Sequence, residues 1–195
     1  MRKSKSETAK TRERILKAAS AQFLSHGITE AGLARLMRAA GLTHGGFYRH
    51  FPSKGQLVAE ACSKAILSLN SGLKSQIEGK PPDQALPLLV GKYLSHGHRD
   101  QPANGCVLAA LGSELARADA KTRAAATEGF LGLSRLIADQ LKNVSAKKAE
   151  AQSMAIVAAL IGAITLARIV PDSRISNSIL SGTRDHILKS VRRKR

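Results

Sequence analysis

The sequence predicts an all-α protein, and three observations lead to that fold class. Apolar residues recur at three- and four-residue spacing along almost the whole chain, and no alternating strand pattern persists for more than a few positions. Glycine, proline and N-capping residues divide the chain into segments of helical length. The 195 residues are 43% hydrophobic, which is enough to bury a core. We therefore expect a globular protein built from helices.

The first helix is expected over residues 8–26. Ile15, Ala19 and Phe23 lie on one face of such a helix. Gly27 follows at the position where a helix end favours a left-handed residue. A second, short helix is indicated by the spacing of apolar residues over 33–40.

A third short helix and a long fourth helix follow. Gly41 ends the second helix, and Thr43 is a suitable N-cap for the next one. Pro52 cannot continue a helix, whereas Ser53 suits an N-cap, so a long helix is expected to begin there and to connect two parts of the protein. We expect loops at 78–83 and 96–105 and further helices at 83–95, 104–118, 120–142, 147–169 and 173–191.

The charge of the chain favours a polyanionic partner. Lys and Arg number 31 against 14 Asp and Glu, which gives a formal net charge of +17. Residues 1–60 hold 11 basic and 4 acidic residues, so the excess per residue is greatest near the N-terminus. Nucleic acid is the first candidate partner and an anionic membrane surface the second.

Several functional classes receive no support from the sequence. Cys62 and Cys106 lie 44 residues apart without a CxxC spacing, so neither a disulfide framework nor a zinc site is expected, and no cofactor is implied. No apolar signal core follows the basic N-terminus, which predicts a cytoplasmic protein. The apolar run from Met154 to Val170 has only 14 uncharged residues before Arg168, fewer than the roughly 20 that span a membrane, so we expect a buried helix there.

The stretch AGLTHGGFYRHFPSKGQL, from Ala40 to Leu57, has the composition of a helix-turn-helix. A short helix, a glycine-centred turn and a second short helix are the parts of that motif. The second helix enters the DNA major groove by its N-terminal end, where small or polar residues are needed. Thr43, His44 and Gly45 meet that need.

The side chains that follow are expected to divide between core and surface. Phe47 and Phe51 are expected to anchor the short helix to the core, whereas Tyr48 and His50 can donate hydrogen bonds to phosphate oxygens. Lys54 lies in the first turn of the long helix, where its ammonium and the exposed backbone N–H groups can hold a phosphate together. Taken singly, each aromatic residue here is also consistent with an ordinary core position.

This stretch, with the preceding TRERILKAASAQFLSHG, resembles the TetR family of bacterial transcriptional repressors over about residues 8–60. The resemblance implies a three-helix DNA-binding domain over residues 1–52 and a larger helical effector-binding and dimerisation domain over residues 53–195. It also implies a homodimer that binds a palindromic double-stranded operator and is released by a small-molecule effector of unknown identity.

Carried over by position, the resemblance places Thr43, His44 and Gly45 at the start of the recognition helix. It makes Tyr48 and His50 phosphate contacts, with Lys54 as the usual lysine. The full set of expected DNA-binding residues is Arg35, Arg38, Thr43, His44, Gly45, Tyr48, Arg49, His50 and Lys54. Gly32, Gly46, Phe47 and Gln56 depart from the common family choices, so no base preference transfers from a relative.

Basic residues outside the motif have two interpretations each. Arg35 and Arg38 lie at i and i+3 on the helix that crosses the DNA backbone in this motif, and we expect at least one to contact phosphate. The arm MRKSKSETAKTRER is either a solvated tail or a minor-groove and phosphate contact. The C-terminal KSVRRKR is expected to be a solubilising end.

The second domain offers one chemically interesting residue. Cys106 precedes a helix, where unpaired N–H groups would favour its thiolate and make it reactive. It is either a small buried residue or a sensor of electrophiles and oxidants. His96 and His98 lie nearby but are expected to be loop residues, because His-x-His with one cysteine is a weak metal signal.

The last two helices are expected to form the dimer interface. The segment 153–167 is apolar almost all round, and its small residues allow close helix approach. Pairing with its counterpart and with the apolar face of the last helix would make a four-helix bundle. The alternative is an interior helix within one subunit. The small residues of the segment are Ala155, Ala158, Ala159, Gly162 and Ala163. The apolar residues of the last helix are Ile175, Ile179, Leu180, Ile187 and Leu188.

Two other classes of function are alternatives to a repressor. No Gly-rich phosphate loop, HExxH, GxSxG or paired-carboxylate arrangement appears, so catalysis is not expected. A nonspecific nucleic-acid coating protein would account for the charge but not for the helix-turn-helix or the apolar helix. Competition between a palindrome and bulk DNA distinguishes the two, because a repressor prefers its site by about 10³-fold or more.

Overall fold

The computed structural model describes residues 5–142 and 144–192, and the described chain is helical throughout, without a strand. The elements in order are α1 (Lys5–His26), α2 (Leu33–Ala39), the 3₁₀ helix η1 (His44–Arg49), α3 (Lys54–Ile77), α4 (Pro82–Tyr93), α5 (His96–Asp100), the 3₁₀ turn η2 (Pro102–Asn104), α6 (Val107–Ala116), α7 (Ala120–Ala138), α8 (Ala146–Ile169) and α9 (Ser173–Arg192). The all-α prediction is confirmed for the described residues.

The helix boundaries follow from local capping. The Oγ of Ser53 accepts a hydrogen bond from the N–H of Gln56 at 3.1 Å, which begins α3 where the sequence predicts. Gly27 and Gly41 have φ of 84° and 68° and terminate α1 and α2 in the left-handed region. Asp119 caps α7 by accepting from the N–H of Thr122 at 2.8 Å.

Two hydrophobic clusters hold the molecule together. The first joins α1, α2, η1 and the start of α3 to α6, with Ile15, Phe23 and Phe47 at 1% exposure or less. The second joins the end of α3 to α4, α7, α8 and α9, around residues such as Val157 and Leu160, which are fully buried. The first cluster contains Val107, Leu111 and Leu115 of α6, so α6 packs directly against the N-terminal helices.

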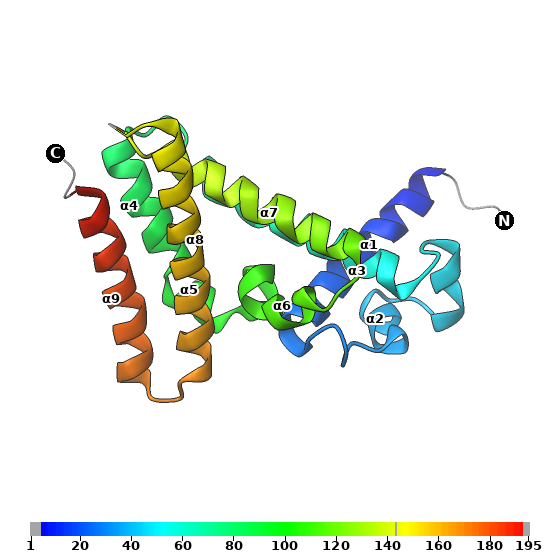
Figure 1. Ribbon diagram of the computed structural model, residues 1–195. Coiled ribbons are helices and arrows are strands. Elements are labelled where there is room, and N and C mark those ends of the chain that lie inside the picture. The colour runs from blue at the N-terminus through cyan, green and yellow to red at the C-terminus, as the bar shows by residue number, and fades with distance from the viewer. Residues whose placement is uncertain (1–4, 143, 193–195) are drawn as a thin grey trace.

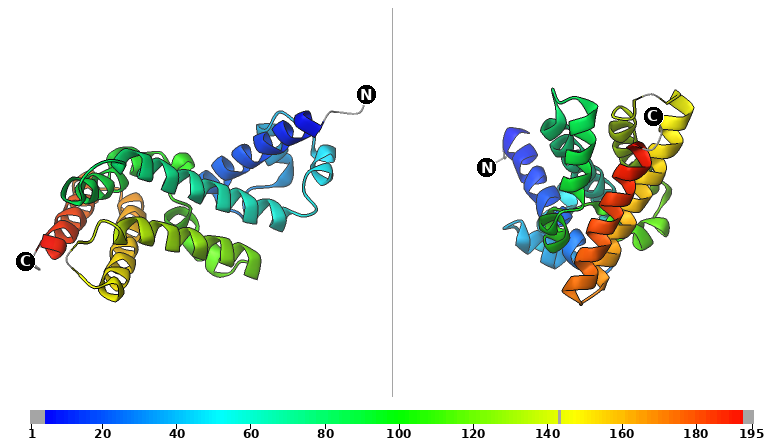
Figure 2. Two further views of the ribbon diagram at one scale, coloured as in Figure 1. Left: turned by 90° about the horizontal axis from the view of Figure 1, so that it is seen from above. Right: turned by 90° about the vertical axis from the view of Figure 1, so that its left-hand side faces the viewer.

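The long helices α3 and α7 connect the two ends of the molecule. They run side by side in both figures, from the N-terminal helices to the pair α8 and α9 (Figures 1 and 2). The two backbones approach closely at Gly129, where a Cβ would lie 2.2 Å from Cγ2 of Ile66. Asn70 donates to the Gly129 carbonyl at 3.1 Å and fixes this crossing.

One local expectation is wrong, and one expected helix has 3₁₀ geometry. The segment 96–105 is not a loop, because Ser95 caps α5 through the N–H of His98 at 3.2 Å and Arg168 of α8 donates to the carbonyls of His98 and Arg99. The segment after Thr43 is a 3₁₀ helix and not an α-helix. Its glycine pair favours the α-helix poorly, so the tertiary anchoring of Phe47 decides its shape.

Helix α8 has one buried and one exposed side. Ile156, Val157, Leu160 and Ile164 pack within the subunit, as the interior-helix alternative expects. From Ala151 onward the other side is exposed and apolar, and its exposed residues are Ala151, Ala155, Ala158, Leu166 and Ile169. Among the described residues, α8 is the one helix whose length and composition would let it cross a membrane, although much of it is buried in this fold.

Candidate DNA-binding surface and ligand cavity

The η1 segment presents polar side chains outward on a buried aromatic anchor. Phe47 and Phe51 are fully buried, with stacked rings whose centroids lie 5.9 Å apart. Tyr48 meets the edge of Phe47 at 5.1 Å yet stays 66% exposed. Thr43, His44, Gly45 and Arg49 are also exposed, and His50 is half-buried. The predicted division between anchors and outward-facing side chains therefore matches the fold.

The helix before the turn offers two further cations. Arg35 and Arg38 are both exposed on α2. Gly32 occupies the N-cap of α2 in an extended conformation and supplies no side-chain hydrogen bond. The structure thus places the two arginines where a contact to DNA phosphate is possible, and the contact itself stays a prediction.

Most of the basic arm is helical. Arg2 and Lys3 lie outside the described residues, but α1 begins at Lys5, so the residues after it form a helix and not a tail, although residues 5–10 are exposed. Arg12 pairs with Glu60 at 2.5 Å and lies over the ring of Phe51 at 4.5 Å. This arginine therefore ties α1 to α3.

Glu60 is held as a carboxylate by this pairing. Burial acts to raise its pKa, but hydrogen bonds from Arg12 and Gln56 outweigh burial, and the pKa of Glu60 falls below its ordinary value. Lys121 of α7 donates to the side-chain oxygen of Gln56 and extends the network across to α7.

Lys54 is already engaged within the protein. Its side chain is half-buried, and its Nζ donates to the carbonyl of Ile28 at 2.9 Å. This bond ties the start of α3 to the loop between α1 and α2. An ammonium has three donors, so two remain for the phosphate contact that we predict.

A carboxylate from α6 holds the same loop. Glu114 accepts from the N–H groups of Ile28 and Thr29, each at 2.9 Å, and from the Thr29 hydroxyl at 3.1 Å. Gly27 lies so close that a Cβ there would be 2.8 Å from the Glu114 carboxylate. No local pattern marks Glu114, because its partners lie about 85 residues away along the chain.

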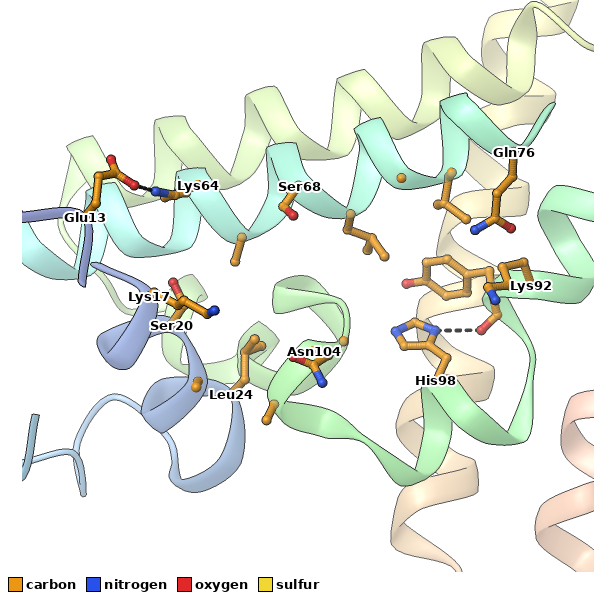
Figure 3. Close-up of a pocket in the computed structure, with 18 of the residues that line it drawn as sticks. Glu13, Lys17, Ser20, Leu24, Lys64, Ser68, Gln76, Lys92, His98 and Asn104 are labelled. Carbon is orange, nitrogen blue, oxygen red and sulfur yellow. Dashed lines mark hydrogen bonds and ion pairs between the residues drawn. The ribbon is translucent and has the colours of Figure 1, made fainter. Parts of the chain in front are cut away.

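A cavity of about 650 Å³ opens between the N-terminal helices and the rest of the molecule. Figure 3 shows Lys17, Ser20 and Leu24 on α1 facing Ser68 on α3, with Gln76 of α3 near Lys92 at the other end. Lys92 and His98 lie at the end remote from Glu13 and Lys64, which form an ion pair (Figure 3). The volume of the cavity lies in the range of small-molecule binding sites.

The inner wall of the cavity is a fixed polar cluster. Tyr93 is 1% exposed and meets the ring of His98 edge-on at 4.7 Å. The Nδ1 of His98 donates to the Tyr93 carbonyl at 2.6 Å, and its Nε2 accepts from the N–H of Cys106 at 2.9 Å. Burial and Arg168 lower the pKa of His98, so its ring is neutral in this tautomer. His98 is thus not the loop residue that was expected.

Cys106 has the burial that the first of its two interpretations, a small buried residue, expects. Cys106 is the N-cap of α6 but is 2% exposed. Burial raises its pKa, although Tyr93, the first N–H groups of α6 and Arg168 act to lower it. Burial also raises the pKa of Cys62 to about 12. Among the described residues, no three His, Cys, Asp or Glu side chains gather as metal ligands.

Comparison with known families assigns both halves of the chain. Residues 15–61 match the model of the bacterial regulatory proteins of the tetR family, and residues 82–175 match the C-terminal domain of LmrA/YxaF-like transcriptional regulators. The chain belongs to the TetR family. The first match runs from α1 into α3 and includes η1, and the second runs from α4 into α9.

Individual relatives are distant transcriptional regulators. The HTH-type regulator YerO of Bacillus subtilis is 31% identical over 94 residues, which are 46% of this chain and 32% of YerO. The repressor NemR of Escherichia coli is 27% identical over 139 residues, 68% of each protein. The chain spans about a third of the length of YerO and 27% of the probable acrEF/envCD operon repressor of Escherichia coli.

Solved structures share the TetR fold. Reduced Escherichia coli NemR superimposes with a TM-score of 0.76 at 22% identity, covering 91% of this chain and 95% of NemR. A TetR regulator from Chloroflexus aurantiacus gives 0.80 at 22% identity, with 95% and 96% covered. At this identity the likeness establishes the fold alone.

Proposed function

We propose that this TetR-family protein is a cytoplasmic transcriptional repressor that binds a palindromic DNA operator as a homodimer and releases it on binding a small molecule. The observation that carries the proposal is the exposed polar face of η1 on its buried Phe47 and Phe51 anchor. Residues 1–52 serve as the DNA-binding domain and residues 53–195 as the effector-binding and dimerisation domain.

The exposed residues of η1 divide by their place in the motif. Thr43, His44 and Gly45 begin the segment and read base edges, because the N-terminal end of the recognition helix enters the major groove. Tyr48, Arg49, His50, Arg35, Arg38 and Lys54 bind phosphates and set the register of the protein on DNA. The excess of positive charge strengthens both kinds of contact.

The exposed side of α8 supports the dimer. Leu166 and Ile169 are 53% and 67% exposed, and Ile175 at the start of α9 is 53% exposed. Figure 1 shows α8 and α9 side by side at the end of the molecule opposite the N-terminal helices. Pairing this surface with a second copy removes the apolar side chains from water and sets the spacing of two η1 segments. Leu180 and Ile187, expected in the interface, are instead buried within the subunit.

Selection from random DNA, followed by competition, tests the function. The protein is incubated with a randomised duplex library, and the recovered consensus is measured against bulk DNA at fixed salt. We expect a palindrome bound by a dimer and preferred by about 10³-fold or more. Equal affinity for the palindrome and bulk DNA would instead identify a nonspecific DNA-binding protein.

A thiol sensor acting through Cys106 on the same scaffold is the second candidate. The observation in its favour is that the thiol begins α6, the helix whose other end carries Glu114, so an adduct there would displace a helix joined to the DNA-binding part. The buried, protonated thiol requires a local opening before it reacts. Alkylation of native protein that modifies Cys62 first, or leaves the operator bound after Cys106 is modified, would remove this candidate.

A further inference from the structure

The cavity between α1 and the helices α3 to α5 has a buried hydrogen-bond donor at its inner end. The Tyr93 hydroxyl oxygen is buried, and among the described residues it meets no hydrogen-bond partner of normal geometry, although the Cys106 thiol lies beside it. A buried hydroxyl left without a full partner costs about 1–3 kcal/mol. An acceptor atom in the cavity would recover that free energy.

The surrounding groups keep the Tyr93 hydroxyl protonated, so it can donate a hydrogen bond to a ligand. Burial raises the pKa of Tyr93 well above its ordinary value, so the hydroxyl keeps its proton. Both ring nitrogens of His98 are used within the protein, one on the Tyr93 carbonyl and one on the Cys106 N–H. His98 therefore positions the tyrosine and does not itself bind a ligand.

The charged side chains that line the cavity favour a ligand of negative charge. Four cations, Arg14, Lys17, Lys64 and Lys92, lie on its wall with a single acid, Glu13, which is paired with Lys64. Within the described part of the chain, neither Lys17 nor Lys92 forms an ion pair. A cationic ligand would be repelled here, whereas an anion is attracted from both ends of the cavity.

Between the charged groups the wall is apolar. Leu24 of α1 faces the cavity together with Leu69 and Leu73 of α3, and small alanines fill the spaces between them. A hydrocarbon ligand that binds here gains about 25 cal/mol of binding free energy for each Å² of apolar surface that leaves water. The site thus combines an apolar wall with one hydrogen-bond donor, Tyr93, and positively charged surroundings.

We propose that the cavity binds an amphipathic organic acid, whose carboxylate accepts a hydrogen bond from Tyr93 and whose apolar body lies between Leu24 and Leu73. The proposal rests on the proposed function in one respect, that this ligand is the effector of the repressor. Six residues of α1 line the cavity, so the ligand contacts the DNA-binding part directly. Its binding changes the spacing between α1 and α4 and hence the position of η1.

Calorimetry without DNA tests the site apart from the function. Hexanoate, octanoate, decanoate, dodecanoate and the aromatic acid naphthoate are titrated into the full chain, with decanol and decyltrimethylammonium as neutral and cationic matches for decanoate. We expect at least one acid to bind below about 1 mM at one molecule per chain, at least tenfold tighter than its neutral match, with no binding of the cation. No binding of any acid, or equal binding of decanol, overturns the proposal.

Tyr93→Phe distinguishes acid binding in the cavity from nonspecific acid binding to a highly basic protein. The substitution removes a hydroxyl that has no full partner, so the thermal midpoint should not fall, while affinity for the acid should fall at least about tenfold. Tyr48→Phe is the matched control, because Tyr48 is the other tyrosine of the chain and lies on η1, far from the cavity lining. Equal affinity in Tyr93→Phe and wild type overturns the proposal.

Two further measurements test the role of the cavity lysines and the effect of the acid on operator binding. Replacing Lys17 and Lys92 together by Gln should weaken acid binding by about twofold to fivefold, whereas Lys147→Gln on α8 should leave it unchanged. Acid binding that depends on Tyr93 but leaves the operator complex intact would support the site and refute its role as the effector site. Operator binding by a protein that binds none of the acids would refute the site and leave the repressor function standing.

Discussion

Glu114 joins α6 to the loop that precedes the helix-turn-helix, and removing its carboxylate should loosen that joint. The carboxylate accepts hydrogen bonds from two backbone N–H groups and one hydroxyl, at 2.9, 2.9 and 3.1 Å. In Glu114→Ala all three donors must turn to water, while Glu114→Gln keeps one acceptor oxygen. The two variants therefore form a graded series at one position.

The size of the effect follows from the number and exposure of these bonds. A hydrogen bond to a charged group contributes about 1.5–3 kcal/mol when buried, but Glu114 is half-exposed and Thr29 is exposed, so the lost donors are partly rehydrated. We expect about 2 kcal/mol of lost stability for Glu114→Ala and about 1 kcal/mol for Glu114→Gln. At about 2–4 °C for each kcal/mol in a chain of this size, the midpoint should fall by about 4–8 °C in the alanine variant.

Differential scanning calorimetry and operator titration measure the two consequences. Operator affinity should fall by about fivefold to tenfold in Glu114→Ala, because the loop no longer fixes α2 and η1 relative to α6. Glu128→Ala is the control, since Glu128 is 73% exposed and its nearest cation, Arg135, is 3.7 Å away. A midpoint and an operator affinity that match those of Glu128→Ala would show that the loop is positioned by its packing and not by Glu114.

The other predictions concern single side chains. Lys54→Ala should weaken binding to operator and bulk DNA alike and lower the salt slope by about one unit, and a loss confined to the operator would contradict a phosphate contact. His44→Ala should change the selected base consensus, and an unchanged consensus would exclude His44 from base readout. Because the pKa of His98 is lowered in the fold, the imidazole binds a proton more tightly in the unfolded chain than in the folded one. The free energy of unfolding should therefore fall as pH drops below about 6.5, by at most about 1.4 kcal/mol per pH unit. His98→Gln should remove that component of the pH dependence, measured as the thermal midpoint between pH 8 and pH 5 in comparison with His186→Gln, whose side chain is exposed.

Local patterns determined the helices and their ends. The apolar face of Ile15, Ala19 and Phe23 required a helix that buries that face, and Gly27 and Ser53 act on the backbone within three or four residues of themselves. Such interactions are complete in the sequence, because both partners lie in one short segment. The division of Phe47 from Tyr48 is of the same kind, since neighbouring residues on a helical turn must face different ways.

Contacts between distant segments decided everything that the sequence left open. In the segment 96–105, which was expected to be a loop, Ser95 caps α5 locally, and Arg168 holds the carbonyls of His98 and Arg99 from about 70 residues away. The same packing buries Cys106 and so raises the pKa that an isolated helix start would lower. Glu114 and Tyr93 have no local signature, since the role of each depends on groups that the fold alone brings within a few ångströms. Sequence therefore determined which segments are helical and which faces are apolar, and the tertiary structure decided which polar groups meet, because hydrogen bonds and burial depend on distance in space and not along the chain.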